Sequence, residues 1–458
     1  MAGSSAAADQ KQAGRAPPPP DWTLDAALAW LNSKVNFERT PDRSEAARAL
    51  KLERMTALAN ALGNPQLTVP AIHVAGSKGK GSITKMAASM LTAAGRRTGA
   101  FTSPHLVAPN ERVAVDREPI GDGDFARSLW NVSQAETRLP ASVTERFGTP
   151  TYFEAITAAA FDHFADAGCG TAVYEVGLGG RLDSTNILKP AVCVLGSIEL
   201  EHTEILGDTL EAIAAEKAGI LKPGVPAISV PQPPNVLRVF RESASRVGAP
   251  LAVLGEDIEF SYEMEGRRAV IRINTGDRIL TDVRCPFPGA HQAANTAAAI
   301  AACTVLLDDE LRERTIREGL AQTPSDGRME VVHTQPTTIV DGAHTPISVR
   351  AALDALPHDQ CPLVTIFSCA SDKAAAGMLA HIATRAGLTI FTEAGPRATS
   401  AAQLDSMYRE LGGISRVARD PKDALDAARE HADGKGTILA CGSFMLAGAI
   451  KQVATDEV

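Results

Sequence analysis

The sequence predicts an α/β protein of two domains, and three features of the chain support this prediction. An apolar run over residues 69–75 ends in a glycine-rich turn, and a helical pattern over residues 82–94 follows it, so that strand, loop and helix come in succession. Apolar runs then alternate with helical patterns, which is typical of largely parallel sheets. The length of 458 residues exceeds one ordinary core and suits two domains.

The elements on either side of the glycine-rich turn follow this alternation. Ordered structure is expected from about Trp22, after a tail over residues 1–21 that is rich in Ala, Ser, Gln and Pro and lacks the apolar segment of a signal peptide. Helical spacing of apolar residues predicts helices over residues 24–31, 45–62, 153–164 and 209–217. Buried strands are predicted over residues 171–176 and 191–197.

Two later segments differ from this pattern. Over residues 251–283, apolar and polar residues alternate around turn signals, which predicts an antiparallel β insert. Helices resume at His291, and the Pro-Ser-Asp-Gly segment over residues 324–327 indicates a linker. Beyond it, helices alternate with strands predicted near Ile339, Val364, Leu388 and Ile438. We therefore expect a first domain over residues 22–325 and a smaller one over residues 326–458.

The composition favours a globular enzyme and argues against two kinds of partner. Hydrophobic residues make up 45% of the chain and charged residues 22%, and the formal net charge of -9 disfavours binding to nucleic acid. None of the seven cysteines forms a CxxC pair, so we expect reduced, buried thiols. No apolar run reaches membrane-spanning length. These features predict a cytoplasmic monomer without a membrane partner.

The glycine-rich turn has the residues of a phosphate-binding loop, which are Gly76, Ser77, Lys78, Gly79, Lys80, Gly81 and Ser82. Glycines allow backbone N–H groups to approach a phosphate chain, and the helix that follows adds the positive end of its dipole. Lys80 can reach the outer phosphates as a mobile charge. Gly81 stands where the common P-loop has Ser or Thr directly after its lysine, so the loop is a variant. A purely structural turn is the alternative.

Charged residues follow the predicted strands where a ligand crevice is expected. Glu175 ends an apolar strand, and a carboxylate at that edge of a parallel sheet can bind Mg²⁺; a surface carboxylate is the alternative. Glu201 and His202 follow the next strand, although a lone histidine is more often structural than a ligand. By spacing alone, Lys217 is a lysine at a helix end beside a glycine cap.

Together these segments resemble the folylpolyglutamate synthase and dihydrofolate synthase family, within the Mur ligase superfamily. The resemblance is collinear from about residue 24 to residue 442. It is carried by residues 73–82, 102–106, 110–112, 175–186, 201–207, 216–220 and 341–344. One such motif would be weak evidence, but several in the same order are specific.

The resemblance implies how the nucleotide is held. Lys80 and its loop would bind the phosphates of ATP, and Asn295 would lie on the adenine side. The second domain would contribute Arg328, Asp341 and His344, which would close on the nucleotide. Lys80, Lys217 and His344 are the implied catalytic residues.

The resemblance also implies the metal ligands. Ser103 and Glu175 would hold one Mg²⁺, and His202 would help to hold a second. Lys217 matches a lysine that the family carbamoylates with CO₂. This changes the interpretation of Lys217, because a carbamate is anionic and could orient the second metal.

The fold and reaction implied by the resemblance are specific. The fold is a P-loop-type ATPase domain with a mostly parallel sheet and a small antiparallel β insert, plus a second, smaller Rossmann-like α/β domain. The reaction is the ATP-dependent addition of L-glutamate to the carboxylate of dihydropteroate or a reduced folate, through an acyl phosphate. A Mur-type ligase for a different acid and a small-molecule kinase are the alternatives.

The chain departs from the family pattern at four places. Ser77 stands where Thr is usual, Glu201 where Asp is usual, and Thr345 where Asn is usual. Residues 442–445 match the terminal Gly-Ser signature only in part. None of these changes removes a phosphate or metal group. The pterin pocket is expected around residues 110–112 and 151–153.

Overall fold

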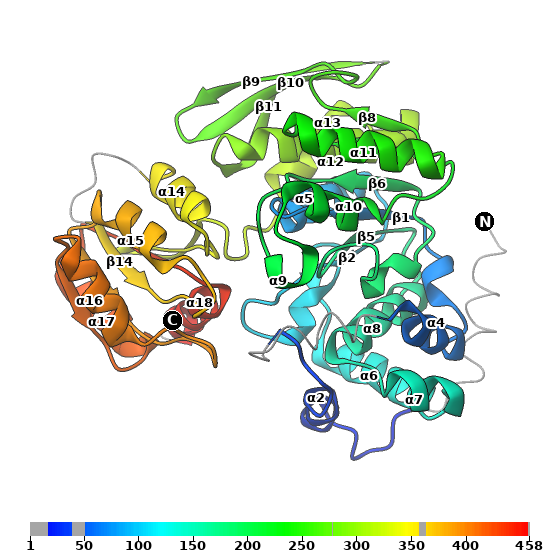
Figure 1. Cartoon of the computed structure of the whole chain (residues 1–458), viewed down its shortest axis with the longest axis horizontal. Helices are drawn as coiled ribbons and strands as arrows, with labels where there is room; N and C mark the ends of the chain where they lie inside the picture. Colours follow the sequence, from blue (N-terminus) through cyan, green and yellow to red (C-terminus); the bar gives the residue numbers. More distant parts are fainter. Residues whose placement is uncertain (1–16, 39–50, 277, 357–362, 457–458) are drawn as a thin grey trace.

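The fold contains three β-sheets with helices around them, as a computed structural model of the chain shows (Figure 1). The structure describes residues 17–38, 51–276, 278–356 and 363–456. An eight-stranded and a three-stranded sheet belong to the larger part of the molecule, and a six-stranded sheet forms the smaller part. The predicted fold class, a mostly parallel α/β part and a second, smaller α/β part, is confirmed.

The eight-stranded sheet has the order β4-β3-β2-β5-β1-β6-β7-β8, and it is parallel from β2 to β8. Its strands are β1 (Ala71–Ala75), β2 (Thr98–Phe101), β3 (Val113–Val115), β4 (Glu118–Pro119), β5 (Thr171–Glu175), β6 (Val192–Leu195), β7 (Ala227–Ser229) and β8 (Leu251–Val253). Val74 of β1 lies opposite both Glu175 and Val194. The carboxyl ends of β5, β1 and β6 therefore meet at one edge, where parallel sheets bind ligands.

Helices cover both faces of this sheet. Their bounds are α2 (Leu24–Asn32), α4 (Leu52–Ala61), α5 (Lys80–Ala93), α6 (Asp122–Glu136), α7 (Ala141–Phe147), α8 (Tyr152–Asp166), α9 (Thr203–Leu206), α10 (Leu210–Ala218), α11 (Pro234–Val247), α12 (His291–Leu307) and α13 (Glu313–Ala321). The helices predicted over residues 24–31, 153–164 and 209–217 are confirmed with small shifts at their ends. The helix predicted over residues 45–62 is confirmed from Leu52, and residues 45–50 lie outside the described residues.

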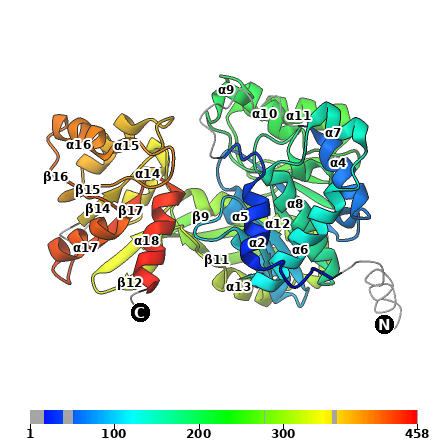
Figure 2. The same ribbon diagram turned by 90° about the horizontal axis from the view of Figure 1, so that it is seen from below.

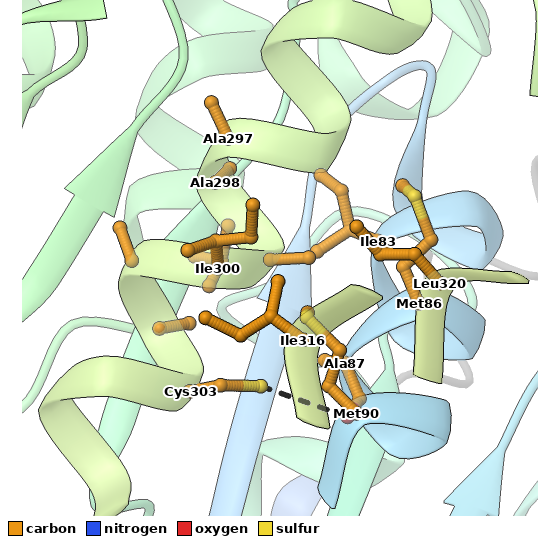
Figure 3. Packing of buried hydrophobic residues seen from close by; sticks show 14 of the residues in the cluster. Ile83, Met86, Ala87, Met90, Ala297, Ala298, Ile300, Cys303, Ile316 and Leu320 are labelled. Atoms are coloured by element: carbon orange, nitrogen blue, oxygen red, sulfur yellow. Dashed lines mark hydrogen bonds between the residues drawn. The ribbon is translucent and has the colours of Figure 1, made fainter. Parts of the chain in front are cut away.

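Three helices, α5, α12 and α13, share one core against the sheet (Figure 3). Ile83 and Met90 of α5 pack in this core with Ile300 of α12 and Ile316 of α13. Half of the buried residues of α12 are alanines, so its backbone can approach α5 closely. The thiol of Cys303 donates to the carbonyl of Ala87 at 3.6 Å. This packing fixes α5, and with it the loop that α5 begins from.

The antiparallel insert is smaller at its start than the sequence predicts. Residues 251–253 form β8, which pairs in parallel with β7 at the edge of the large sheet, so the prediction was wrong there. The insert itself consists of β9 (Phe260–Glu265), β10 (Arg268–Asn274) and β11 (Ile279–Pro288), paired antiparallel. Leu251, Ala252 and Val253 are all apolar, and so short an apolar run does not show whether the neighbouring strand is parallel or antiparallel.

The six-stranded sheet forms the smaller part of the molecule, and its order is β12-β13-β17-β14-β15-β16. Its elements are β12 (Glu330–Thr334), β13 (Thr337–Val340), α14 (Pro346–Asp354), β14 (Leu363–Phe367), α15 (Ala375–Ala383), β15 (Leu388–Phe391), α16 (Ala401–Glu410), β16 (Ser415–Val417), α17 (Pro421–Ala432), β17 (Thr437–Cys441) and α18 (Phe444–Asp456). Figure 2 shows α18 on the side that faces the larger part. There Gly448 lies directly against the carbonyl of Leu106, so a side chain at Gly448 would collide with it.

The cysteines behave as expected where the structure describes them. Cys169, Cys193, Cys285, Cys303, Cys369 and Cys441 are buried and free of disulfides. Burial raises the pKa of the Cys193 thiol to about 12, so this thiol stays protonated. Cys361 lies outside the described residues. Across those same described ranges, the helices are too short or too polar to cross a bilayer.

A buried ion pair joins α4 to α8, and its loss should destabilise the helices around it. Arg54 Nε donates to Glu154 Oε2 at 2.8 Å, and the two side chains are 4% and 5% exposed. Replacing Glu154 with alanine removes this carboxylate from a buried guanidinium, so we expect a loss of about 3–5 kcal/mol in unfolding free energy.

Tryptophan fluorescence during urea unfolding measures this loss of unfolding free energy in the helical layer that contains the tryptophans. The chain has three tryptophans, and Trp22 contacts both Trp30 and Trp130 in the same helical layer. Glu242→Ala is the matched control, because its pair with Arg238 is exposed and should contribute less than about 1 kcal/mol. Equal effects of the two substitutions would contradict the expectation.

Candidate functional site

A cleft of about 760 Å³ lies between the larger and smaller parts of the molecule. Its floor is the edge where β5, β1 and β6 end, and its opposite wall comes from the smaller part. From the larger part it is lined by residues 77–82, Ser103, Glu175, His202 and Asn295, and from the smaller part by Arg328, Asp341 and His344. The structure therefore brings nearly all of the sequence-predicted site residues into one cleft. Lys217 lies beneath it, and Gly76 lies at the base of the loop.

The phosphate loop turns from β1 into α5, and Gly79 is the N-cap of that helix, with φ of 82°. A side chain at Gly79 would collide with Asn295, and one at Gly81 would collide with the guanidinium of Arg328. These glycines are therefore needed because polar side chains from α12 and from the smaller part lie directly on the loop. Lys80 folds back so that its Nζ donates to the Gly76 carbonyl at 2.9 Å.

Backbone hydrogen bonds hold the first half of this loop against the segment after β6. The amides of Ser77 and Lys78 donate to the Ser197 carbonyl at 2.8 and 3.2 Å. The Ser77 hydroxyl donates to the Glu199 carbonyl at 3.0 Å. Ser77, the departure from the expected threonine, thus keeps its hydroxyl in a structural hydrogen bond.

Glu175 is a buried carboxylate at the end of β5, only 4% exposed. Burial raises the pKa of this carboxyl group, while Lys80 and Arg328 oppose that effect. Its Oε2 atom accepts from the backbone amide of Ser103 at 3.0 Å. Ser103 and Glu175 are therefore adjacent, as two ligands of one metal ion would be.

Lys217 lies in the last turn of α10, yet it is 1% exposed and is not a surface lysine. Its Nζ donates to the Gly76 carbonyl at 2.9 Å and to Glu201 Oε1 at 2.8 Å. Burial lowers the pKa of this amine to about 8, with Lys80 adding repulsion and Glu201 acting in the opposite sense. The position predicted from spacing, a helix end beside a glycine cap, is confirmed by the Gly219 cap of α10, but the spacing did not indicate that the side chain is buried.

The partner of this buried amine comes from outside α10. Glu216 pairs with Arg181, and Glu211 accepts from Asn235, so neither acid of α10 pairs with Lys217. Its partner Glu201 comes from the loop after β6. Burial would raise the pKa of Glu201, but Lys80 and Lys217 lower it to about 2. His202 follows with φ of 46° at the start of α9 and lines the cleft.

Three predicted side chains of the smaller part line the cleft, and two of them contact the loop. Arg328 Nε donates to the Ser82 hydroxyl at 3.1 Å. Asp341 accepts from the amides of Met329 and Ala343, both at 2.8 Å, and burial raises its pKa to about 6. Asp341 thus connects the backbone at Met329 with the backbone at Ala343 in the wall of the cleft.

His344 is the third of these side chains, and its tautomer follows from its contacts. Its Nδ1 lies 2.8 Å from the Gly342 carbonyl, and a carbonyl only accepts, so Nδ1 carries the proton. Nε2 is then the acceptor for Lys78 Nζ at 3.3 Å. Burial and the charge of Lys78 lower the pKa of His344 to about 3, so the imidazole is neutral.

Sequence reasoning missed several charged residues that line the same cleft. Lys373 and Arg397 flank Asp372 at 3.9 and 3.7 Å in the smaller part. Asp372 and Lys373 could have been found from their position after the strand predicted near Val364, because parallel sheets bind ligands at the carboxyl ends of their strands. Arg112, expected only as part of the pterin pocket, is 1% exposed and forms a two-pronged ion pair with Glu38 at 2.7 and 2.6 Å. Thr151 and Phe153 line the same end of the cleft.

Comparisons with known proteins agree with this geometry. Residues 128–303 match the Mur ligase middle domain, and residues 327–444 match the Mur ligase glutamate ligase domain. The chain is 32% identical over 439 residues to the dihydrofolate synthase/folylpolyglutamate synthase of Bacillus subtilis, covering 93% of this chain and 98% of that protein. It is 33% identical to the Mycobacterium tuberculosis protein of the same name, over 87% of this chain and 89% of that protein.

Solved structures give the same result. The folylpolyglutamate synthase of M. tuberculosis complexed with ADP superposes with a TM-score of 0.85 at 31% identity, covering 94% of this chain and 98% of that chain. The E. coli FolC protein in complex with DHPP and ADP superposes with a TM-score of 0.81 at 30% identity, covering 96% and 99%.

Proposed function

The chain belongs to the folylpolyglutamate synthase and dihydrofolate synthase family of ATP-dependent glutamate ligases, and from this premise we propose that it joins L-glutamate to the carboxylate of dihydropteroate or a reduced folate. The single observation that supports this most is the cleft itself, where a phosphate loop faces cationic groups from a second α/β part. We place the boundary between the two domains near residue 325.

The chemistry explains why both parts are needed. A carboxylate is a poor acyl donor, because oxide is a poor leaving group. Transfer of the γ-phosphoryl group of ATP onto it forms an acyl phosphate and ADP, and the amine of glutamate then attacks the carbonyl carbon and releases phosphate. Water would hydrolyse the acyl phosphate, so closure of two domains over the reactants favours the ligase reaction.

The phosphates of ATP would bind where the loop and Arg328 meet. Lys80 would leave the Gly76 carbonyl, 2.9 Å away, to contact the outer phosphates, and Arg328 would offset their charge from the other side. Asn295, which lies over Gly79, is suited to the adenine side of the nucleotide. Asp341 and His344 would shape the second-domain wall of this site.

The oxygen and nitrogen ligands in the cleft suit Mg²⁺ that is bound together with the phosphates of a nucleotide. The described residues contain no cluster of three or more acidic, His or Cys side chains arranged for a metal ion. Mg²⁺ does not need one, since it usually binds one or two protein oxygens, phosphate oxygens and waters. Glu175 and Ser103 supply adjacent oxygens for one ion, and His202 lies where it could help hold a second. Bound Mg²⁺ would neutralise charge that develops on the phosphates.

Lys217 fits the proposed carbamate. A carbamate forms when a neutral amine attacks CO₂ and loses a proton, and the lowered pKa of about 8 makes the neutral amine accessible. The product would place an anion beside Glu201, now 2.8 Å from the amine. Two adjacent buried anions require a cation between them, which supports a second Mg²⁺ near His202.

The two organic substrates would occupy opposite ends of the cleft. Glutamate carries two carboxylates, and Lys373 and Arg397 offer matching charges on the wall that belongs to the smaller domain. The pteroyl group would lie near Phe153 and Thr151, beside the Arg112–Glu38 pair. The acid group of the pteroyl substrate would then point toward the phosphate loop between them.

Heavy-oxygen labelling of the pteroyl carboxylate tests the proposed chemistry. If the carboxylate attacks the γ-phosphorus, one heavy oxygen should appear in the inorganic phosphate that is released together with the glutamyl amide. A kinase would make a stable phosphorylated product without needing glutamate. Unlabelled phosphate alongside amide formation would contradict the acyl-phosphate route.

A further inference from the structure

Arg328 reaches the phosphate loop from a backbone turn in the linker between the two domains. Asp326, Gly327 and Met329 in this turn have φ of 20°, 66° and 48°. Left-handed backbone is unfavourable at a residue other than glycine, because Cβ comes too close to the neighbouring carbonyl oxygen. Contacts around the turn must therefore hold it, and they also decide where Arg328 points.

Four alternating charges, here named the linker network, surround this turn. Lys85 Nζ lies 2.7 Å from Asp326 Oδ2, and Lys451 Nζ lies 3.7 Å from Asp326 Oδ1. Lys451 also lies 2.7 Å from Glu330 Oε1, and the other oxygen of Glu330 accepts the Gly327 amide at 2.7 Å. The network connects α5, which carries the phosphate loop, with the linker, β12 and α18.

The charge of Asp326 separates two cations. Lys85, Asp326 and Arg328 line one small cavity, and burial and the charge of Arg328 both lower the pKa of Lys85. Burial would raise the pKa of Asp326, but Lys85 reverses this, so the carboxylate stays ionised beside Lys85. Lys85 and Glu330 are 15% and 16% exposed, whereas Asp326 and Lys451 are 44% and 28% exposed, so water screens these pairs in part.

We propose that Asp326 is a positioning residue that holds the guanidinium of Arg328 over the phosphate loop by offsetting Lys85 and fixing the linker turn. Lys451 and Glu330 attach the same turn to the smaller domain. Domain closure and the placement of Arg328 thereby become one event. This inference rests on the proposed role of Arg328 at the nucleotide.

The sign of the effect distinguishes positioning from simple electrostatics. Removing a negative charge near a phosphate site should strengthen anion binding through space. Positioning predicts the opposite, because without Asp326 the repulsion from Lys85 displaces Arg328. Asn has nearly the shape of Asp, and Asp326 is 44% exposed, so the Asp326→Asn chain should fold normally.

Calorimetric titration of ADP into the full chain tests the proposal. Asp326→Asn should weaken ADP binding about tenfold, and Asp326→Glu should retain most of the affinity because it keeps the charge. In an Arg328→Ala background, Asp326→Asn should not weaken ADP binding any further, because the residue it positions is gone and only the through-space effect of the lost charge remains. Glu265→Gln is the control, since its exposed pair with Arg284 lies on the three-stranded sheet and should leave ADP binding unchanged.

The possible outcomes separate the two proposals. If Asp326→Asn binds ADP as tightly as the unsubstituted protein, or more tightly, the positioning role is overturned. It is also overturned if Asp326→Asn weakens ADP binding as much in the Arg328→Ala background as it does alone. If Arg328→Ala alone binds ADP like the unchanged chain, the proposed role of Arg328 at the nucleotide fails. That result would leave the ligase reaction itself untouched.

Discussion

Lys80→Ala is expected to lower kcat by about 100- to 1000-fold or more while the fold stays intact. In the structure the amine of Lys80 donates to the carbonyl of Gly76 at the base of the loop, at 2.9 Å, so its loss removes little from the core. With ATP bound, the same amine is expected to offset charge on the outer phosphates throughout phosphoryl transfer. Initial rates of ADP formation with saturating substrates measure the effect.

A lysine away from the cleft provides the control for this substitution. Lys189 is exposed, so Lys189→Ala should keep its activity and its unfolding midpoint. Lys80→Ala should unfold at nearly the same temperature as the unchanged chain. A folded Lys80→Ala protein with near-normal kcat would show that Lys80 does not serve the phosphates.

Lys217→Ala is expected to lose activity by a similar factor and to regain part of it when acetate or another short carboxylate is added. The reason is the proposed carbamate, whose anionic oxygens the small acid would replace in the vacated space. Unmodified, Lys217 is a cation beside the metal sites and would repel the ions bound there. Rates measured over a series of acetate concentrations should rise and saturate.

The neighbouring acid of the same helix provides the matched control for Lys217. Glu216 pairs with Arg181 through its side chain, so Glu216→Ala should keep nearly full activity and should not respond to acetate. Carbon NMR of the unchanged chain with labelled bicarbonate should show a carbamate signal that Lys217→Ala lacks. Full activity of Lys217→Ala without acetate would leave only a structural ion pair with Glu201.

The local sequence was enough to predict those parts of the fold that depend on residues close together along the chain. The run of apolar residues before Gly76 predicted β1, and the acid at the end of the next buried run predicted Glu175 at the ligand edge. Both follow from the geometry of parallel strands, in which carboxyl ends share one edge. Resemblance to a family then supplied Asn295, Arg328 and His344, which no local spacing indicates.

The remaining features depend on contacts between distant residues. Lys217 has the spacing of a surface lysine, and only the position of Glu201 after another strand shows that it is buried. Residues 251–253 form a short apolar run next to the alternating insert, but their neighbour is the parallel strand β7. The pairing of Lys85 with Asp326 joins residues 241 positions apart, and nothing in either local sequence indicates it.

Glutamate-dependent release of ADP tests the central claim most directly. The unchanged chain should be assayed with ATP and Mg²⁺, with dihydropteroate or with tetrahydrofolate, and each time with and without L-glutamate. Sustained ADP release is expected only when glutamate and at least one of the two pteroyl acids are both present, with one glutamyl amide formed per ADP. Sustained release without glutamate, or none with either acid, would contradict the proposed ligase function.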